Sequence, residues 1–169
     1  VCAMRIRFSP LPVVVLALLP LSPTTAMAQN HSQIATVRNG VSCPRCNLFQ
    51  AELGGLQVRA INLSGARLRQ ADMSLSVLNR ARFGNADLRD VNAFGAVMSG
   101  ASFAGADLGN ASFVGTSLRG SDFTGAKLEG TNFSGADLSQ ARGLTQTQLN
   151  RACGDALTQL PHGLAIASC

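Results

Sequence analysis

The chain has 169 residues, of which 46% are hydrophobic and 14% are charged, with 14 basic residues against nine acidic ones and a formal net charge of +5. This composition excludes a charged, disordered chain, which would lack the apolar content needed to collapse. The length predicts a single domain, and the mild positive charge does not by itself indicate a nucleic-acid partner.

The first segment of the chain, residues 1–28, has the pattern of a secretory signal peptide. Arg5 and Arg7 give it a positive start, an apolar run follows at 11–21, and AMA ends at Ala28 as a small-x-small cleavage site. Cleavage there predicts a mature bacterial protein that is periplasmic or secreted and has no membrane span. An uncleaved signal anchor is the alternative.

A period of five residues runs through residues 46–140, which follow an N-terminal tail and cap predicted at 29–45. The stretch FAGADLGNASFVGTSLRGSDFTGAKL, at 103–128, has a large apolar residue at every fifth position, a small residue two positions earlier and glycine in one recurring slot. Neither a helix nor a strand has this period. Since one unit buries almost no surface, stability must come from successive coils that stack, with a turn in every unit.

The units ADLGN, ADLRD and ADLSQ resemble the A-(D/N)-L-x-x unit of the pentapeptide repeat family. The resemblance covers Cys46 to Gln140 and implies an all-β fold, a right-handed quadrilateral β-solenoid with four units in each coil. Residues 20 apart would then stack, and the sequence has like residues at that spacing. The expected core consists of a leucine ladder and a phenylalanine ladder: Leu68, Leu88, Leu108 and Leu128, and Phe83, Phe103 and Phe123.

Residues 141–169 abandon the period and are predicted to form a short helical C-terminal cap. Thr145 and Gln148 have the spacing of a capping box, which begins a helix. The apolar residues around them fit one face of that helix and a cover for the last coil: Leu144, Leu149, Ala152 and Leu157 for the helix, and Leu160, Leu164 and Ile166 for the cover.

Four cysteines follow residue 28, and an even number in an oxidising compartment favours disulfides. They are Cys43, Cys46, Cys153 and Cys169, which allow three pairings. A rod of stacked coils would place the two close pairs at opposite ends, which favours Cys153–Cys169 and Cys43–Cys46. The same separation of roughly 20 Å disfavours one zinc site made of all four, because each Zn–S bond needs about 2.3 Å.

Enzymatic functions receive little support from the residues. The motif CPRC, at 43–46, allows a thiol redox function, but a redox dithiol usually lies at a helix N-terminus within a strand-helix-strand unit. The sequence has no recognisable nucleophile, base and orienting group in a catalytic arrangement, so neither an enzyme nor a cofactor is predicted.

DNA mimicry is a second alternative, because some pentapeptide repeat proteins imitate duplex DNA and bind topoisomerases. A rod of roughly 23 Å that imitated a duplex with one charge per ~1.7 Å would need about 14 negative charges. This chain has only nine acidic residues, outnumbered by its basic ones, and an export signal would separate it from DNA enzymes. No nucleic-acid partner is therefore predicted.

The favoured class is an exported scaffold or protein-interaction module, with an unknown protein or the cell envelope as partner and an end-to-end homodimer as one assembly. The N-terminal half is basic, with Arg59, Arg67, Arg69, Arg80, Arg82 and Arg89. Arg69 and Arg89 would stack in one column and are the candidate interaction residues, together with Phe94, which the unit VNAFG places outside the core. A solvated surface without a partner is the alternative.

Overall fold

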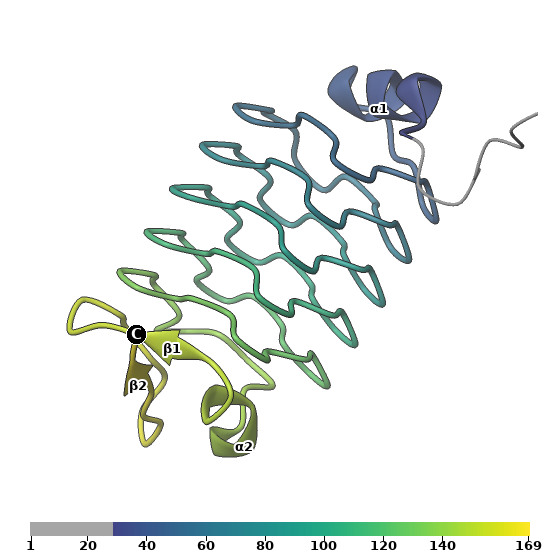
Figure 1. The fold of residues 1–169 in the computed structure, drawn as a ribbon. Helices are drawn as coiled ribbons and strands as arrows, with labels where there is room; N and C mark the ends of the chain where they lie inside the picture. Colours follow the sequence, from purple (N-terminus) through teal and green to yellow (C-terminus); the bar gives the residue numbers. More distant parts are fainter. Residues whose placement is uncertain (1–28) are drawn as a thin grey trace, which may run out of the picture.

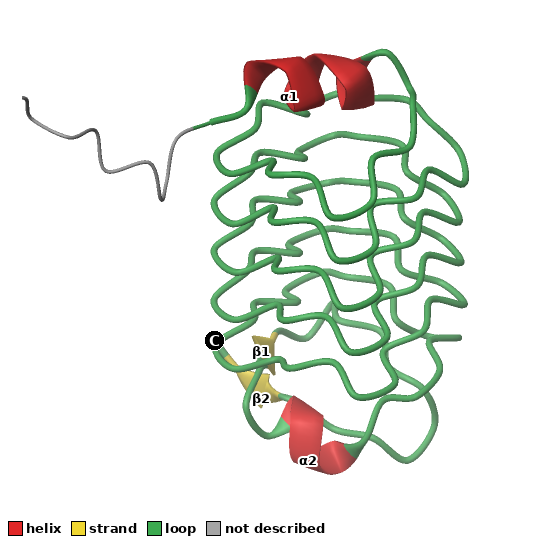
Figure 2. Cartoon of the chain, turned by 90° about the vertical axis from the view of Figure 1, so that its right-hand side faces the viewer, coloured by secondary structure: helices red, strands yellow, loops and turns green. Residues whose placement is uncertain are grey.

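The computed structural model describes residues 29–169, so the predicted signal peptide lies outside the described residues. The chain forms a rod of stacked coils, with helix α1, His31–Arg38, across one end (Figure 1). Helix α2, Gln146–Leu149, and the paired strands β1, Cys153–Gly154, and β2, Ala167–Ser168, lie at the other end. A view turned by 90° shows the same arrangement and the regular spacing of the coils (Figure 2).

Parallel hydrogen bonding joins residues that lie 20 positions apart, which makes each coil four units of five residues. Arg67 is bridged to Asp87, and Asp87 in turn to Asp107. The N–H of Leu68 donates to the carbonyl of Asp87 at 2.8 Å, and the N–H of Asp87 donates to the carbonyl of Ala66 at 2.9 Å. The predicted β-solenoid is therefore present, with its strands reduced to single bridges.

The backbone turns once in each unit, after the central apolar residue. The N–H of Ala106, for example, donates at 2.9 Å to the carbonyl of Phe103, three residues earlier. The last slot of the unit has a positive φ, which is 67° at Gly105 and 55° at Leu75. Glycine adopts this conformation without steric cost, whereas a leucine does so under strain.

The Asp or Asn that precedes the central residue stabilises the same turn. The side chain of Asp122 accepts the N–H of Thr124 at 2.9 Å, and the side chain of Asn132 accepts the N–H of Ser134 at 2.8 Å. These are Asx turns, in which a short polar side chain pairs with an N–H two residues later. They explain why Asp or Asn recurs in the second position of the unit.

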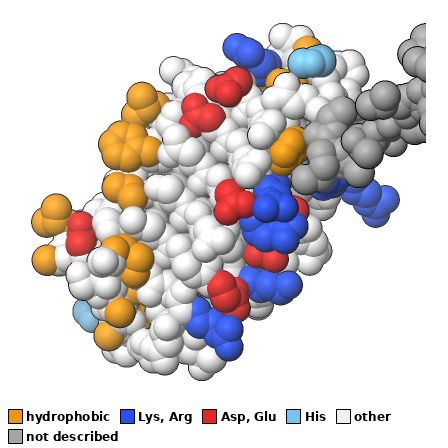
Figure 3. Space-filling model, in the orientation of Figure 1, with side chains coloured by type: hydrophobic (Ala, Val, Ile, Leu, Met, Phe, Trp, Pro, Cys, Tyr) orange, Lys and Arg blue, Asp and Glu red, His pale blue; other side chains and the backbone are white. Residues whose placement is uncertain are grey.

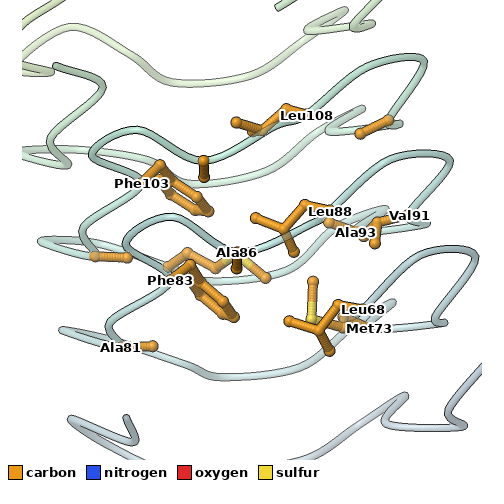
Figure 4. Close-up of a cluster of buried hydrophobic side chains, with 14 of the residues drawn as sticks. Leu68, Met73, Ala81, Phe83, Ala86, Leu88, Val91, Ala93, Phe103 and Leu108 are labelled. Atoms are coloured by element: carbon orange, nitrogen blue, oxygen red, sulfur yellow. The ribbon is translucent and has the colours of Figure 1, made fainter. Parts of the chain in front are cut away.

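Like residues stack on one another inside the rod (Figure 4). The ring centroids of Phe83 and Phe103 are 5.2 Å apart and those of Phe103 and Phe123 are 5.0 Å apart, with the rings nearly parallel. Phe113 meets Phe103 edge-on at 5.7 Å. The leucine column is buried beside them: Leu68, Leu88, Leu108 and Leu128. The stacked and edge-on rings are the geometries that aromatic pairs prefer.

Buried hydroxyl groups replace alanine in the small inward slot of four units, and in three of them the hydroxyl donates to the preceding coil. Thr116 donates to the carbonyl of Ala93 at 2.8 Å, and Thr131 donates to the carbonyl of Leu108 at 2.9 Å. Ser121 makes the equivalent bond to an earlier coil. A buried hydroxyl is costly only when it is unpaired, so the slot accepts Ser and Thr because a central carbonyl of the preceding coil lies within reach.

Helix α1 closes the N-terminal end of the core, where the sequence predicts a tail and cap without any helix. Asn30 caps the helix by accepting the N–H of Gln33 at 3.2 Å, and Ile34 and Val37 are buried against the first coil. The Gln33 side chain accepts the N–H of Asn47 at 2.7 Å. The Gln33 side chain thus takes the place of the carbonyl that a preceding coil would supply to this N–H.

The hydrogen-bonded ladder extends beyond both ends of the predicted solenoid, residues 46–140. At the N-terminal end, the N–H of Cys43 donates to the carbonyl of Asn62 at 2.9 Å. At the C-terminal end, bridges reach Cys153 and Gln159, at spacings longer than 20 residues. Because these spacings are longer, the last coil contains extra residues, and α2 lies within it.

Helix α2 is a single turn that begins with the predicted capping box of Thr145 and Gln148. The Gln148 side-chain amide also donates to the carbonyls of Phe123 and Ala126, at 3.0 and 2.9 Å. In earlier coils the corresponding carbonyls accept hydrogen bonds from the following coil, as Leu108 does from the Thr131 hydroxyl and Ala106 does from the Lys127 N–H. The glutamine therefore satisfies backbone groups that would otherwise be exposed where the regular ladder ends.

The predicted helix face was wrong for Leu144, Ala152 and Leu157, which lie outside α2; of the four residues only Leu149 belongs to it. Helix α2 ends at Leu149, the chain rejoins the ladder at Cys153, and the side chain of Leu157 is 74% exposed in the loop that follows. The residues predicted to cover the last coil are partly buried against the core: Leu160, Leu164 and Ile166. The helix is short because the backbone groups of Cys153 bond to the preceding coil, at Thr131 and Phe133, and so cannot continue the helix.

Two glycines provide a matched test of the left-handed slot. Gly120 has a φ of +67° and no atom within 4 Å of an added Cβ, so Gly120→Ala introduces backbone strain alone. We expect it to lower the free energy of unfolding by about 1–2 kcal/mol, the cost of a left-handed L-residue. In Gly84→Ala, where φ is not in that region and the nearest atom is 3.6 Å from the new Cβ, the change should stay within about 0.5 kcal/mol. Urea unfolding followed by circular dichroism measures both, and equal values for the two variants would contradict this role of the slot.

Candidate interaction surfaces

Strand β2 is joined to the last coil by hydrogen bonds and by a disulfide. It pairs in parallel with β1, so that Ala167 lies beside Cys153, and the N–H of Cys169 donates to the carbonyl of Gly154 at 2.9 Å. Cys153 and Cys169 form a disulfide, with their Cα atoms 4.9 Å apart. The last residues of the chain therefore cover part of the edge that the final coil would otherwise leave open.

A second disulfide joins Cys43 to Cys46 in the first coil, with Cα atoms 5.6 Å apart. Both residues are buried, which shields the sulfur atoms from an incoming thiol. The two disulfides lie at opposite ends of the rod, and no group of three or more His, Cys, Asp or Glu that could hold a metal occurs within residues 29–169.

Arg69 and Arg89 stand in neighbouring coils, and each is paired with a carboxylate. The Arg69 Nε atom lies 3.1 Å from an oxygen of Asp90. The Arg89 guanidinium donates to both oxygens of Asp87, at 2.8 and 2.7 Å. These pairs are partly exposed and contribute little stability, but they compensate the charge of both arginines. The column of Arg69 and Arg89 therefore presents paired charges, and its role in binding a partner stays a prediction.

Further ion pairs continue along the same edge of the rod. Lys127 lies 3.7 Å from Asp107, and Arg151 lies 3.0 Å from Glu129. In the space-filling view, blue and red side chains lie side by side along the right-hand edge (Figure 3). This edge offers a partner a nearly neutral surface of paired charges.

Phe94 belongs to an apolar strip on the opposite edge of the rod. Its side chain is 52% exposed, and Leu75 and Val97 are 65% and 36% exposed. A Cβ added to Gly95 would lie 3.0 Å from the Leu75 side chain, so Leu75 lies over the turn that carries Phe94. We call Leu75, Phe94 and Val97 the apolar ridge. Figure 3 shows hydrophobic side chains gathered along the left-hand edge.

Sequence reasoning singled out Phe94 but missed the rest of the ridge. Leu75 occupies the turn slot that holds glycine or a polar residue in nearly every other unit, and Val97 occupies an outward slot that usually holds a polar residue. Both residues could have been found from the five-residue register, because a large apolar residue outside the two inward slots must be exposed.

The carboxylates of the turns are held in their charged form. Hydrogen bonds from the Arg89 side chain lower the pKa of Asp87. Hydrogen bonds from the hydroxyl and the N–H of Thr124 lower the pKa of Asp122. A general acid at neutral pH needs the opposite shift, so these residues serve the turns and do not form a proton-transfer pair.

No pocket is found between residues 29 and 169, and no helix in that range is long and apolar enough to cross a membrane.

A family model described as Pentapeptide repeats matches the chain with eight copies, over residues 59–100, 101–140 and 116–153. These matches cover more than half of the chain. No curated protein sequence matches it.

Several solved structures are similar to the chain. QnrB1, described as a plasmid-mediated fluoroquinolone resistance protein, is 15% identical over 72% of this chain and 66% of its own, with a TM-score of 0.42. A thylakoid-lumen pentapeptide repeat protein of Arabidopsis thaliana is 28% identical over 65% of this chain and 58% of its own, with a TM-score of 0.29. Rfr23 of the cyanobacterium Cyanothece 51142 is 25% identical over 72% of this chain and 85% of its own, with a TM-score of 0.34. The chain thus spans less than two thirds of the first two.

Asp122 gives a test of how stability depends on pH. Its pKa in the folded protein lies below the ordinary value of 3.8, so its stabilisation is complete above about pH 5 and is lost as the pH falls through the folded pKa. Asp122→Asn keeps an acceptor for the turn, as Asn132 does naturally, but cannot titrate. We expect urea unfolding to show a smaller loss of stability between pH 7 and pH 3 in this variant than in the wild type. An identical loss in both proteins would contradict the assignment.

The disulfide between Cys153 and Cys169 closes a loop with a sequence separation of 16, which corresponds to about 3 kcal/mol in the chain-entropy model. The double variant Cys153→Ser/Cys169→Ser should lose about that much free energy of unfolding. Adding a reducing agent to this variant should then cause only a smaller further loss, because the other disulfide has a separation of only 3. Urea unfolding with and without reductant measures both effects, and unchanged stability of the double variant would argue against the bond.

Proposed function

The chain belongs to the pentapeptide repeat family, and from that premise we propose that it is an exported, non-catalytic scaffold that binds a protein partner through the outside of a right-handed, four-sided solenoid. Proteins of this family are generally structural or interaction modules. The observation that carries the proposal is the apolar ridge of Leu75, Phe94 and Val97.

The ridge has the character of a binding surface. Large apolar side chains that are exposed together on a rigid framework gain free energy when a partner removes them from water. Leu75 is also held in a left-handed conformation, with a φ of 55°, in a slot where glycine would be less strained. Polar residues such as Gln70 and Arg80 share this conformation in other units, so it is the exposed apolar side chain of Leu75 that supports a role in contact with a partner.

The absence of catalysis is proposed on the distribution of titratable groups among residues 29–169. The two histidines lie far apart, His31 in α1 and His162 in the C-terminal cap. The carboxylates accept hydrogen bonds from turns or pair with basic side chains, as Asp122 and Asp90 illustrate. A thiol redox role is disfavoured because Cys43 and Cys46 are buried.

Export is proposed from the sequence of residues 1–28 and agrees with the pairing of the four later cysteines, since disulfides persist in oxidising compartments. We do not extend the proposal to an end-to-end homodimer, because α1 covers one end and β2 covers part of the other. DNA mimicry is not proposed either, since the acidic side chains are few and several of them are paired with bases.

The ridge can be tested by recovering partners of the tagged chain from bacterial cell envelopes after crosslinking. Phe94→Ser combined with Leu75→Asn removes most of the apolar surface, and Asn tolerates the left-handed conformation. We expect the proteins recovered with the wild type to fall at least tenfold with this variant. Val41→Ser is the matched control, because Val41 is exposed to a similar extent, 54%, in the first coil, and it should recover the same proteins as the wild type.

Two outcomes would overturn the proposal. Equal recovery by all three forms would show that the ridge contacts no partner. Accumulation of the chain inside the cytoplasm, measured by fractionation of the same cells, would contradict export.

A further inference from the structure

In the first coils of the rod, after α1, four exposed arginines have no carboxylate within ion-pair distance among residues 29–169. They are Arg45, Arg59, Arg80 and Arg82. In the same part of the chain, Arg69 and Arg89 each pair with an aspartate. We call the four unpaired residues the arginine face.

The coil register brings these four side chains to one side of the rod. The N–H of Ala60 donates to the carbonyl of Asn79 at 2.8 Å, so Arg59 and Arg80 lie at the same corner in successive coils. Arg82 follows two residues later, on the flat side that begins at this corner, where it is bridged to Asn62.

Arg45 lies at the far corner of the same side. Its N–H donates to the carbonyl of Ser64 at 2.9 Å, and a Cβ added to Gly65 would lie 3.3 Å from the Arg45 side chain. With coils about 4.8 Å apart and about 3.3 Å of rise for each extended residue, the four residues share an area of roughly 10 Å by 10 Å.

Neutral residues occupy the rest of this area, so the positive charge is not compensated. Ser42 and Asn62 are the outward residues of the neighbouring layers, and the Asn62 N–H donates to the Ser42 hydroxyl at 2.9 Å. In the column of bridged residues that begins at Arg82, the next residue is Ser102 and the first acidic residue is Asp122, two coils further along the rod. A potential of one sign on a rigid surface attracts counter-charges of the opposite sign.

The geometry favours an extended anionic surface over other anionic partners. The side is flat and has no pocket for a single anion within the described residues. The exposed aromatic residue Phe94 belongs to the ridge and not to this side, so stacking of nucleic-acid bases has no platform here. Helix α1 lies at this same end of the rod and follows the predicted signal peptide, residues 1–28, in the sequence. This end would therefore pass close to a membrane during the proposed export.

We propose that the arginine face binds the anionic headgroups of a phospholipid bilayer and holds the N-terminal end of the rod against the membrane surface. This inference rests on the proposed export, and it leaves the apolar ridge free for a protein partner. Each arginine near an anionic surface strengthens binding by about fivefold, so binding through four of them is reversible and sensitive to salt.

The test is co-sedimentation of the purified chain with vesicles at low ionic strength. We expect binding to vesicles of phosphatidylcholine with one third phosphatidylglycerol, little binding to phosphatidylcholine alone, and release in 0.5 M NaCl. Arg80→Gln combined with Arg82→Gln should weaken the partition coefficient by roughly 25-fold, from about fivefold for each arginine.

Arg69→Gln combined with Arg89→Gln is the matched control. It changes the net charge equally but removes arginines that are paired with Asp90 and Asp87, so its partition coefficient should stay within about threefold of the wild type. Thermal unfolding of both variants checks that the solenoid is intact.

Three results would overturn the inference. The first is equal weakening of vesicle binding by both double variants, which would indicate a general effect of net charge. The second is equal binding to vesicles with and without phosphatidylglycerol. The third is that the wild type binds no vesicles but recovers an acidic protein that the Arg80→Gln/Arg82→Gln variant does not recover. Because the assay uses purified protein and lipid, its failure leaves the crosslinking result for the apolar ridge unaffected.

Discussion

The structure depends on the hydrogen-bonded register between coils, in which each residue lies beside the residue 20 positions later. Every coil supplies donors and acceptors to the next, and like side chains stack in the interior, as Phe83, Phe103 and Phe123 do. A single inserted residue in the middle of the rod would move every following side chain out of its column. Extra residues occur only in the last coil, between Arg142 and Gln159, where few later columns depend on them.

This constraint separates the roles of the side chains. The two inward slots of each unit are committed to packing, whereas the outward side chains, including those of the turn slot, vary from unit to unit. Three surfaces result on one rod: the apolar ridge, the edge of paired charges and the arginine face. Because the framework is regular, the character of each surface follows from which residues recur in one column.

The sequence predicted the core well because the five-residue period is local and unbroken. It missed helix α1, whose eight residues contain only two buried apolar side chains, Ile34 and Val37. That helix is stabilised by packing over the open end of the first coil and by the bond between Gln33 and Asn47, 14 residues apart. Leu157 was misplaced for a similar reason, since the ladder at Cys153 ends the helical pattern that the sequence suggests.

The sequence by itself determined the coil, the buried ladders and the positions of the turns, because those follow from a repeated pattern of small, large and flexible residues. Only the tertiary structure decided which charges remain available. Arg69 pairs with Asp90, 21 residues away in the next coil, and Arg89 pairs with Asp87 two residues before it, while Arg80 and Arg82 pair with no carboxylate among residues 29–169. Long side chains on the outside of a coil can reach across layers, so their partners are set by three-dimensional proximity and not by the repeat.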